Sequence, residues 1–288
     1  CRNGPKSVIL FPGRLGAGMK KHSYPPPLDI ETAVRITDGF LVSETGKAGR
    51  HKLIVGMSGG IDSAVSSALA VRALGRENLV AVKMPYKSSN PLSEKHADLV
   101  IEKLGVKSLR VDITPMVNRY FKDEPDADNI RRGNFMARTR MAVLFDLSAK
   151  LDALVLGTGN KSEWLLGYTT LYGDSACALN PICDLYKTQV YEMAMFLGIP
   201  EEIIIKPPSA DLWPSQTDEG DMGILYSEAD AVLYLAVDRK VSPDDIPAKL
   251  GMTGEKVSNI LDRMDKMAFK RRLPLFPKMS YGGRKHEN

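Results

Sequence analysis

Hydrophobic residues in the first half of the chain follow two periodicities in turn. Short apolar runs bounded by glycine, proline or polar residues are typical of buried strands, and they occur at 52–57, 79–84, 108–111 and 153–156. Apolar residues at helical spacing predict helices at 29–44, 63–75, 93–104 and 129–150. Because strands alternate with helices, the pattern predicts an α/β fold with a doubly wound parallel sheet and helices on both faces.

The strand pattern fades beyond residue 185. Helical spacing continues at 187–197, 227–236 and 254–272, which predicts a helical C-terminal part. The stretch 207–223 contains three prolines, Trp213 and several acidic residues, and we expect a loop there rather than a helix or strand. It is either a loop that becomes ordered when a ligand binds or a simple surface linker.

A glycine turn follows the first predicted strand. Residues 53–63 read LIVGMSGGIDS, which is a buried strand followed by Ser58, two glycines and a helix start. Adjacent glycines let the backbone approach a ligand closely, and hydroxyls and helix N-terminal amides donate to an anion. Asp62 places a carboxylate beside this anion site, where a magnesium ion would bridge it to phosphate. Unless the segment is an ordinary Gly-Gly turn, it predicts nucleotide, phosphate and magnesium together.

This loop lies where such a sheet binds its ligand. Doubly wound sheets bind ligands at the carboxyl ends of their strands, and Ser58, Pro85 and Thr158 all follow predicted strands. The loop has no Walker A lysine and does not match G-x-G-x-x-G. It resembles instead the pyrophosphate loop of the N-type ATP pyrophosphatases, which include NAD, GMP and asparagine synthetases and tRNA-thiolating enzymes. That resemblance implies cleavage of ATP between its α and β phosphates through an adenylated substrate.

Composition narrows the class of protein. The 288 residues are 43% hydrophobic and 26% charged with a net charge of +4, which argues against a nucleic-acid-binding or membrane-surface protein. No apolar run approaches the roughly 20 residues that span a bilayer. Three cysteines make neither a disulfide framework nor a zinc cluster, so we expect a cytoplasmic location. We expect residues 1–18 to be a disordered extension ahead of a start at Met19, and 19–288 to form a single domain.

Further polar blocks narrow the resemblance to one family. The blocks GNFMARTRM, GTGNKSE, GYTTLYGD, LYKTQVYE, KPPSADL and FKRRLP follow SGGIDS in this order. Any one of their polar residues, taken alone, fits a surface salt bridge, a solvated lysine or a helix-start carboxylate. Together the blocks resemble the NAD synthetases from about residue 28 to about residue 274.

The resemblance implies an ammonia-dependent ligase. ATP would adenylate the nicotinate carboxylate of deamido-NAD with release of pyrophosphate, and ammonia would then displace AMP to give NAD. Magnesium would be the cofactor, with Asp62 and Glu163 as its protein ligands. ATP would contact Gly56, Met57, Ser58, Gly59, Gly60, Ile61, Asp62, Ser63, Thr158, Lys187 and Ser209. Deamido-NAD would contact Asn134, Arg138, Phe269 and Lys270.

The residue types suit this chemistry. Attack of a carboxylate on the α-phosphate brings two anions together, so magnesium and Lys187 would neutralise charge in the transition state. Asp62 and Lys187 are therefore candidate catalytic residues. Asp174 is a third candidate that could guide or deprotonate ammonia, or else it only caps a turn after Gly173.

The sequence departs from the family where the acceptor would bind. Some members have lysine at the position of Leu171, aspartate at Ala178 and histidine at Phe269, so other groups must recognise the nicotinate half. About 50 residues precede SGGIDS, too few for a glutaminase domain, so we expect ammonia to be supplied directly or by a separate subunit. The family also implies a homodimer in which both chains line the deamido-NAD site, with 141–151 and 269–276 as candidate interface segments.

Two other functions stay open at this point. Another adenylating pyrophosphatase, tRNA-thiolating or GMP-forming, would share the loop, but Cys177 and Cys183 lack the C-x-x-C spacing expected for thiolation. A nucleotide sensor without turnover would share the sheet. Such a sensor is expected to lack the paired carboxylates of Asp62 and Glu163.

Overall fold

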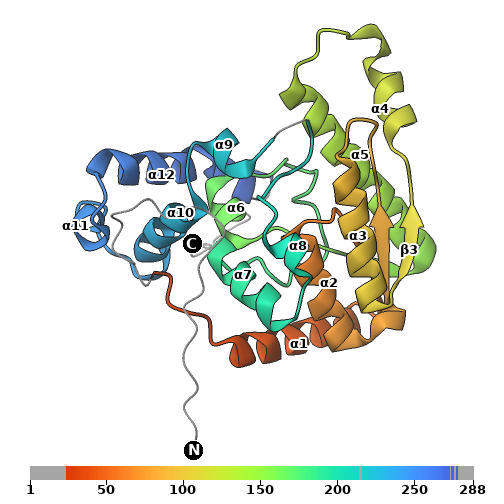
Figure 1. Cartoon of the computed structure of the whole chain (residues 1–288), viewed down its shortest axis with the longest axis horizontal. Coiled ribbons are helices and arrows are strands. Elements are labelled where there is room, and N and C mark those ends of the chain that lie inside the picture. Colours follow the sequence, from red (N-terminus) through yellow and green to blue (C-terminus); the bar gives the residue numbers. More distant parts are fainter. Residues whose placement is uncertain (1–23, 214–215, 273, 276, 278–288) are drawn as a thin grey trace, which may run out of the picture.

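Four parallel strands form the centre of the fold (Figure 1). The computed structural model describes residues 24–213, 216–272, 274–275 and 277. The strands are β1 (Lys52–Gly56), β2 (Leu79–Lys83), β3 (Lys107–Arg110) and β4 (Ala153–Leu156), in the order β3-β2-β1-β4. The chain winds outward from β1 in both directions, so the topological switch lies between β1 and β4. The predicted parallel sheet is confirmed, and each predicted strand end is within one residue of the observed one.

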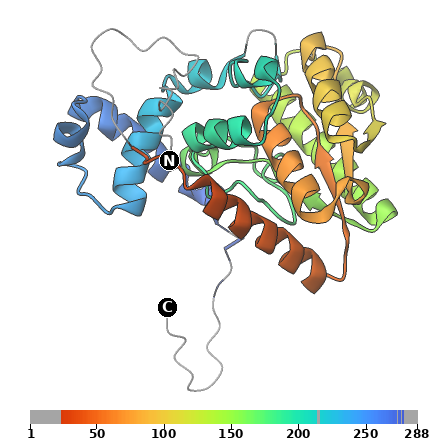
Figure 2. The ribbon, with the colours of Figure 1, turned by 60° about the horizontal axis from the view of Figure 1, so that its bottom comes forward.

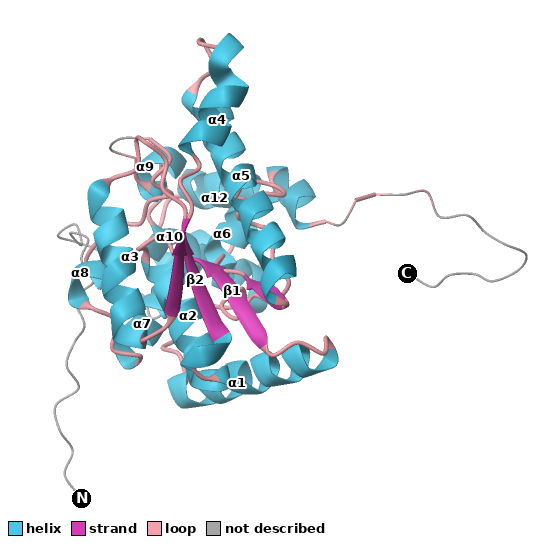
Figure 3. Ribbon diagram, turned by 90° about the vertical axis from the view of Figure 1, so that its right-hand side faces the viewer, coloured by secondary structure: helices cyan, strands magenta, loops and turns pink. Residues whose placement is uncertain are grey.

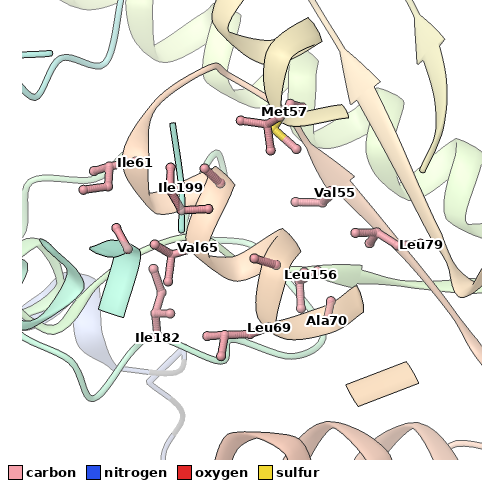
Figure 4. Packing of buried hydrophobic residues seen from close by; sticks show 14 of the residues in the cluster. Val55, Met57, Ile61, Val65, Leu69, Ala70, Leu79, Leu156, Ile182 and Ile199 are labelled. Atoms are coloured by element: carbon pink, nitrogen blue, oxygen red, sulfur yellow. The ribbon is translucent and has the colours of Figure 1, made fainter. Parts of the chain in front are cut away.

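Helices cover both faces of this sheet. α1 (Ile30–Lys47), α2 (Ile61–Leu74) and α3 (Pro91–Leu104) pack on one face, and α4 (Thr114–Tyr120) and α5 (Asn129–Leu151) on the other. Alternate strand residues enter separate cores, because successive side chains of a strand point to opposite faces. Figure 4 shows Val55, Leu79 and Leu156 of the sheet packed against Val65 and Leu69 of α2. Burial on both faces explains why the strands read as continuous apolar runs.

The C-terminal helices form a second hydrophobic core beside the sheet. The helices of this part are α6 (Lys161–Leu166), α7 (Lys187–Phe196), α8 (Glu201–Ile204), α9 (Asp218–Met222), α10 (Tyr226–Leu233), α11 (Ile246–Leu250) and α12 (Gly254–Lys266). The second core contains Leu166, Val232, Leu233, Ile246 and Ile260, each fully buried. Figure 2 shows α10–α12 as a group to one side of the sheet layer, with α6 and α7 between the two parts.

Several features differ from the sequence-based expectations. The stretch 207–223 is not only a loop, because Thr217 accepts from the Gly220 amide and caps the short helix α9. Nor is it a plain surface linker, because Gln216, Asp218 and Met222 are buried. The helix predicted at 254–272 ends at Lys266, and a 3-10 turn, Ala268–Arg271, follows it. The predictions for residues 1–18 lie outside the described residues. In the described part of the chain, none of the helices has the length and apolar character needed to cross a bilayer.

Candidate active site

The glycine turn between β1 and α2 is fixed by its contacts with the neighbouring helix α3. Gly59 has a φ of +75°, and a Cβ placed on it would lie 2.2 Å from the carbonyl oxygen of Ser93. Only glycine fits such a position, for both conformational and steric reasons. The Ser58 and Ser63 hydroxyls lie 3.1 Å apart, and no side chain caps α2 at its N-cap, Gly60. The N-terminal end of α2 is therefore available to an anion, as the sequence predicts.

A cavity of about 930 Å³ opens at the carboxyl ends of the strands. Figure 3 shows the strands running from the side of α1 toward the end of the molecule at which α9 lies. The volume is at the upper end of the range for small-molecule sites. The wall includes the β1–α2 turn, the residues after β2 and β4, one side of α5, and the segment that leads into α9. Segments distant in sequence thus contribute to one site.

One buried lysine joins two carboxylates in this cavity. The Lys187 ammonium, at the first turn of α7, lies 2.5 Å from Asp62 Oδ2 and 3.5 Å from Glu163 Oε1. Lys187 is only 1% exposed. Its Nζ also lies 5.3 Å from the centre of the Tyr226 ring. The three charged residues come from α2, α6 and α7, so the fold brings together groups that are about a hundred residues apart.

Negative charge is in excess around this lysine. Burial alone would lower the pKa of Lys187, but the charges of the surrounding carboxylates hold it above its usual range. Burial and the neighbouring Asp62 raise the pKa of the Glu163 carboxyl well above its usual range. Asp218, at the start of α9, is 4% exposed, and burial raises its pKa as well. An added cation at this place would relieve the repulsion among the carboxylates.

Asn160 holds both carboxylates in position. Its side-chain Nδ2 donates to Asp62 Oδ1 at 2.9 Å. Its Oδ1 accepts from the Glu163 amide while its own amide donates to Glu163 Oε2, which is a capping box at the start of α6. Asn160 was not predicted as a site residue, although an asparagine three residues before a glutamate is a recognisable helix-capping signal.

Asp230 of α10 supports Lys187 from the second core. Asp230 is fully buried and accepts from the Ser162 hydroxyl at 2.5 Å and the Thr188 amide at 2.9 Å. The Ser162 oxygen in turn accepts from the Lys187 amide at 2.8 Å. Burial raises the pKa of Asp230 to about 6. This network fixes the first turn of α7, and no local sequence pattern indicates it.

At the opposite end of the cavity, the polar side chains make hydrogen bonds to main-chain groups and hydroxyls instead of ion pairs. Asn134 Oδ1 accepts from the Thr170 hydroxyl at 2.8 Å. The Lys270 ammonium donates to the carbonyls of Gly167 and Thr169, each at 2.7 Å, and burial lowers its pKa. Asp174 accepts from the Thr170 amide and the Thr169 hydroxyl, each at 2.7 Å, and it also lines the cavity. Asp174 thus holds the Thr169–Thr170 turn and also lines the cavity, so both roles considered for it stay predictions.

Comparison with known proteins identifies the family. The family model described as NAD synthase matches residues 33–274. The chain belongs to the NAD synthase family. The NH(3)-dependent NAD(+) synthetase of Trichlorobacter lovleyi is 53% identical over 255 residues, which cover 88% of this chain and 93% of the relative.

Solved structures give the same family. NH3-dependent NAD synthetase from Campylobacter jejuni, in complex with the nitrate ion, has a TM-score of 0.74 at 31% identity, covering 87% of this chain and 100% of that one. NMN synthetase from Francisella tularensis has a TM-score of 0.76 at 30% identity, covering 88% and 100%. The predicted fold of this family is therefore confirmed.

Most residues that the family resemblance assigned to the site line the cavity. They are Gly56, Met57, Ser58, Gly60, Ile61, Asp62, Ser63, Asn134, Thr158, Glu163, Asp174, Lys187, Ser209 and Lys270. Gly59 lies against α3 instead, where it shapes the turn. Arg138 is exposed and donates from Nε to the Leu171 carbonyl at 3.2 Å, and Phe269 is 58% exposed. These two residues lie on the surface of the chain, outside the cavity wall.

Proposed function

We propose that this chain is an ammonia-dependent NAD synthetase. In the first step, a nicotinate carboxylate oxygen of deamido-NAD attacks the α-phosphorus of ATP. The bond to the bridging oxygen breaks, and its electron pair leaves with pyrophosphate. Ammonia then attacks the acyl carbon and loses a proton, and AMP leaves to give NAD. The observation that carries the proposal is the buried Lys187 between Asp62 and Glu163, at the glycine turn of a family whose relatives bear this name.

Lys187 and the open end of α2 suit the phosphates of ATP. The N-terminal amides of α2 and the hydroxyls of Ser58 and Ser63 supply donors, while Lys187 supplies positive charge. Thr158 and Ser209 line the same cavity and are proposed as further ATP contacts. These groups bind and orient the nucleotide so that its α-phosphorus faces the acceptor.

The donors around Lys187 fit a magnesium ion. Magnesium takes one or two carboxylates together with substrate phosphates, and Asp62 and Glu163 are such a pair. Burial, and after it the charge of Asp62, raises the pKa of Glu163, and a divalent cation would relieve the repulsion between the two carboxylates. Within the described residues no group of three or more His, Cys, Asp or Glu is arranged to hold a metal. When bound, the ion would neutralise charge on the phosphates.

Acceptor binding is assigned to the Lys270 end of the cavity. Asn134 and Lys270 line it, and we propose that they contact deamido-NAD. Asp174, which lines the same wall, is proposed to accept the proton that ammonia loses. Arg138 and Phe269 face outward, which suits a site shared between the two chains of a homodimer. The cytoplasmic location stays a prediction from cysteine usage.

The test is a reaction with defined acceptors. We expect pyrophosphate release and NAD formation from magnesium-ATP, ammonium and deamido-NAD, with glutamine unable to replace ammonium. Release with xanthosine monophosphate in place of deamido-NAD would support the GMP-forming alternative. Absence of pyrophosphate release with deamido-NAD at millimolar ammonium would refute the proposed function.

One neighbour supports a second acceptor. The NMN synthetase of Francisella tularensis has the same fold at 30% identity. Nicotinate mononucleotide carries the same carboxylate as deamido-NAD but lacks its adenylate half. The same assay with nicotinate mononucleotide separates the two, and we expect deamido-NAD to have the higher kcat/KM because the more similar relatives are NAD synthetases.

A further inference from the structure

Lys206, a lysine of the cavity wall, has no role in the function proposed so far. Lys206, between α8 and the segment that leads into α9, lines the cavity and donates from Nζ to the Ser93 hydroxyl at 3.0 Å. Ser93 is 7% exposed in the first turn of α3. Its carbonyl oxygen is the atom that would meet a Cβ at Gly59. Ser93 therefore touches the glycine turn with its carbonyl and Lys206 with its hydroxyl.

Lys206 differs from neighbouring cations in its partners. Lys83 and Arg110 also line the cavity, but both are paired with the Glu94 carboxylate. Lys187 is shared by two carboxylates. Lys206 instead donates to a neutral hydroxyl, that of Ser93. Its positive charge is thus available for an anion in the cavity.

The carboxylate of Asp211 interacts electrostatically with Lys206 but is hydrogen-bonded to another group. Burial lowers the pKa of Lys206, and the charge of Asp211 counteracts this shift. Both Asp211 carboxylate oxygens lie 3.2 Å from the Asn90 amide at the start of α3. A phosphate group at Lys206 would also lie near the N-terminal end of α3, a helix of 14 residues whose dipole favours anions.

We propose that Lys206, held by Ser93, binds the pyrophosphate group that leaves ATP. This inference rests on the proposed function. When the bond between the α-phosphorus and the bridging oxygen breaks, its electron pair stays on that oxygen, so negative charge builds on the departing group. Lys206 lines the same cavity as Lys187, is held by Ser93 next to Gly59 of the glycine turn, and neutralises this charge. Lys187 then neutralises negative charge at the α-phosphate, and Lys206 neutralises it at the leaving pyrophosphate.

Binding of inorganic pyrophosphate tests the assignment directly. Isothermal titration with pyrophosphate and magnesium is carried out on the intact protein and on Lys206→Met, Lys206→Arg and Ser93→Ala. Loss of one charge-assisted contact is expected to raise the Kd for pyrophosphate by about 10- to 100-fold in Lys206→Met. Lys206→Arg should retain most of the affinity, and Ser93→Ala should weaken it by a few-fold, on the order of one neutral hydrogen bond.

A matched control and a second ligand separate the possible outcomes. Lys95→Met removes the same charge from an exposed position on α3 and should leave the Kd unchanged. AMP carries the α-phosphate alone, and its Kd should be unchanged in Lys206→Met. If Lys206→Met binds pyrophosphate within about twofold of the unaltered protein, or loses AMP and pyrophosphate affinity equally, the assignment is wrong. Because this assay needs no acceptor, its result is independent of whether deamido-NAD is the substrate.

Discussion

The two ends of the cavity hold their charges in different ways. At the phosphate end, the Asp62 and Glu163 carboxylates each pair with the buried Lys187, and Asn160 and Asp230 reinforce this arrangement. At the acceptor end, basic side chains bond main-chain carbonyls: Lys270 to Gly167 and Thr169, and Arg138 to Leu171. The first arrangement pairs a buried cation with carboxylates, whereas in the second the basic side chains bond neutral carbonyls and are partly exposed. We infer that one chain is sufficient to position Asp62, Glu163 and Lys187. The acceptor end would be completed by the bound acceptor and, in the proposed homodimer, by the second chain.

The strongest test of the phosphate end is Asp62→Ala. Removing this carboxylate leaves Lys187 and Asn160 without their shared partner and removes one proposed metal ligand. We expect kcat to fall by about a thousandfold or more, on the order of losing a transition-state stabiliser. Pyrophosphate release measures the loss, and circular dichroism verifies the fold. Asp98→Ala, which removes an exposed carboxylate, is the control; near-normal turnover in Asp62→Ala would contradict the assignment.

A substitution of Asn160 tests whether its hydrogen bond to Asp62 affects the rate of the reaction. Asn160→Ser keeps a capping oxygen for α6 but removes the Nδ2 donor to Asp62. We expect kcat to fall by about 10- to 100-fold, as for groups that orient ligands. Because serine is also a good N-cap, the free energy of unfolding should change by less than about 1 kcal/mol. A parallel loss of stability and rate would instead make Asn160 a purely structural residue.

At the acceptor end, the expected effects are smaller and fall on KM. Lys270→Met removes a charge from the cavity wall, so the KM for deamido-NAD should rise by about tenfold while the KM for ATP stays constant. Arg138→Ala should behave likewise if the acceptor is bound between two chains. Arg131→Ala removes an exposed arginine of the same helix and serves as the control. Initial rates at varied acceptor and ATP concentrations distinguish the two ends.

The smallest expected effect concerns pH and Asp230. Its folded pKa of about 6 lies above the ordinary aspartate value of 3.8, so between these pH values the folded chain binds a proton that the unfolded chain has released. Stability from this group therefore falls as pH rises from about 4 to about 6, by at most about 1.4 kcal/mol per pH unit. Asp230→Asn cannot ionise and should lack this slope. Urea midpoints at pH 4.5 and 7 measure it, and equal slopes in both proteins would remove Asp230 as its source.

Local hydrophobic patterns predicted the parallel sheet and the glycine turn after β1 well. Strand β1, the glycine turn and helix α2 are continuous in sequence, so apolar spacing and two glycines were sufficient to indicate them. The parallel sheet followed from the alternation of strands and helices. The pairing of Asp62 with Glu163 was expected only from the family resemblance, because no periodicity relates residues so far apart. The ion pairs of both carboxylates with Lys187 were not predicted.

Other parts of the site carry no readable local signal. Asp230 is 68 residues from Ser162, and a single aspartate on an apolar helix resembles any surface carboxylate. Helix α9 was missed because its five residues, Asp218–Met222, contain one apolar side chain and cannot show an amphipathic period. The outward position of Arg138 and Phe269 could not be predicted either. Asn134 and Arg138 are four residues apart in one helix, and this spacing does not indicate which of them faces the cavity.

The bond from Asp230 to the first turn of α7 makes the position of Lys187 depend on the second hydrophobic core. Proteins open in cooperative units with different free energies, and a helical group packed beside a sheet is a natural unit of this kind. If α10–α12 detach while the sheet persists, the Ser162 hydroxyl and the Thr188 amide lose their shared acceptor, Asp230. Activity should then disappear on heating before the sheet melts. Hydrogen exchange would show the amides of α10 released ahead of those of β1 and β4.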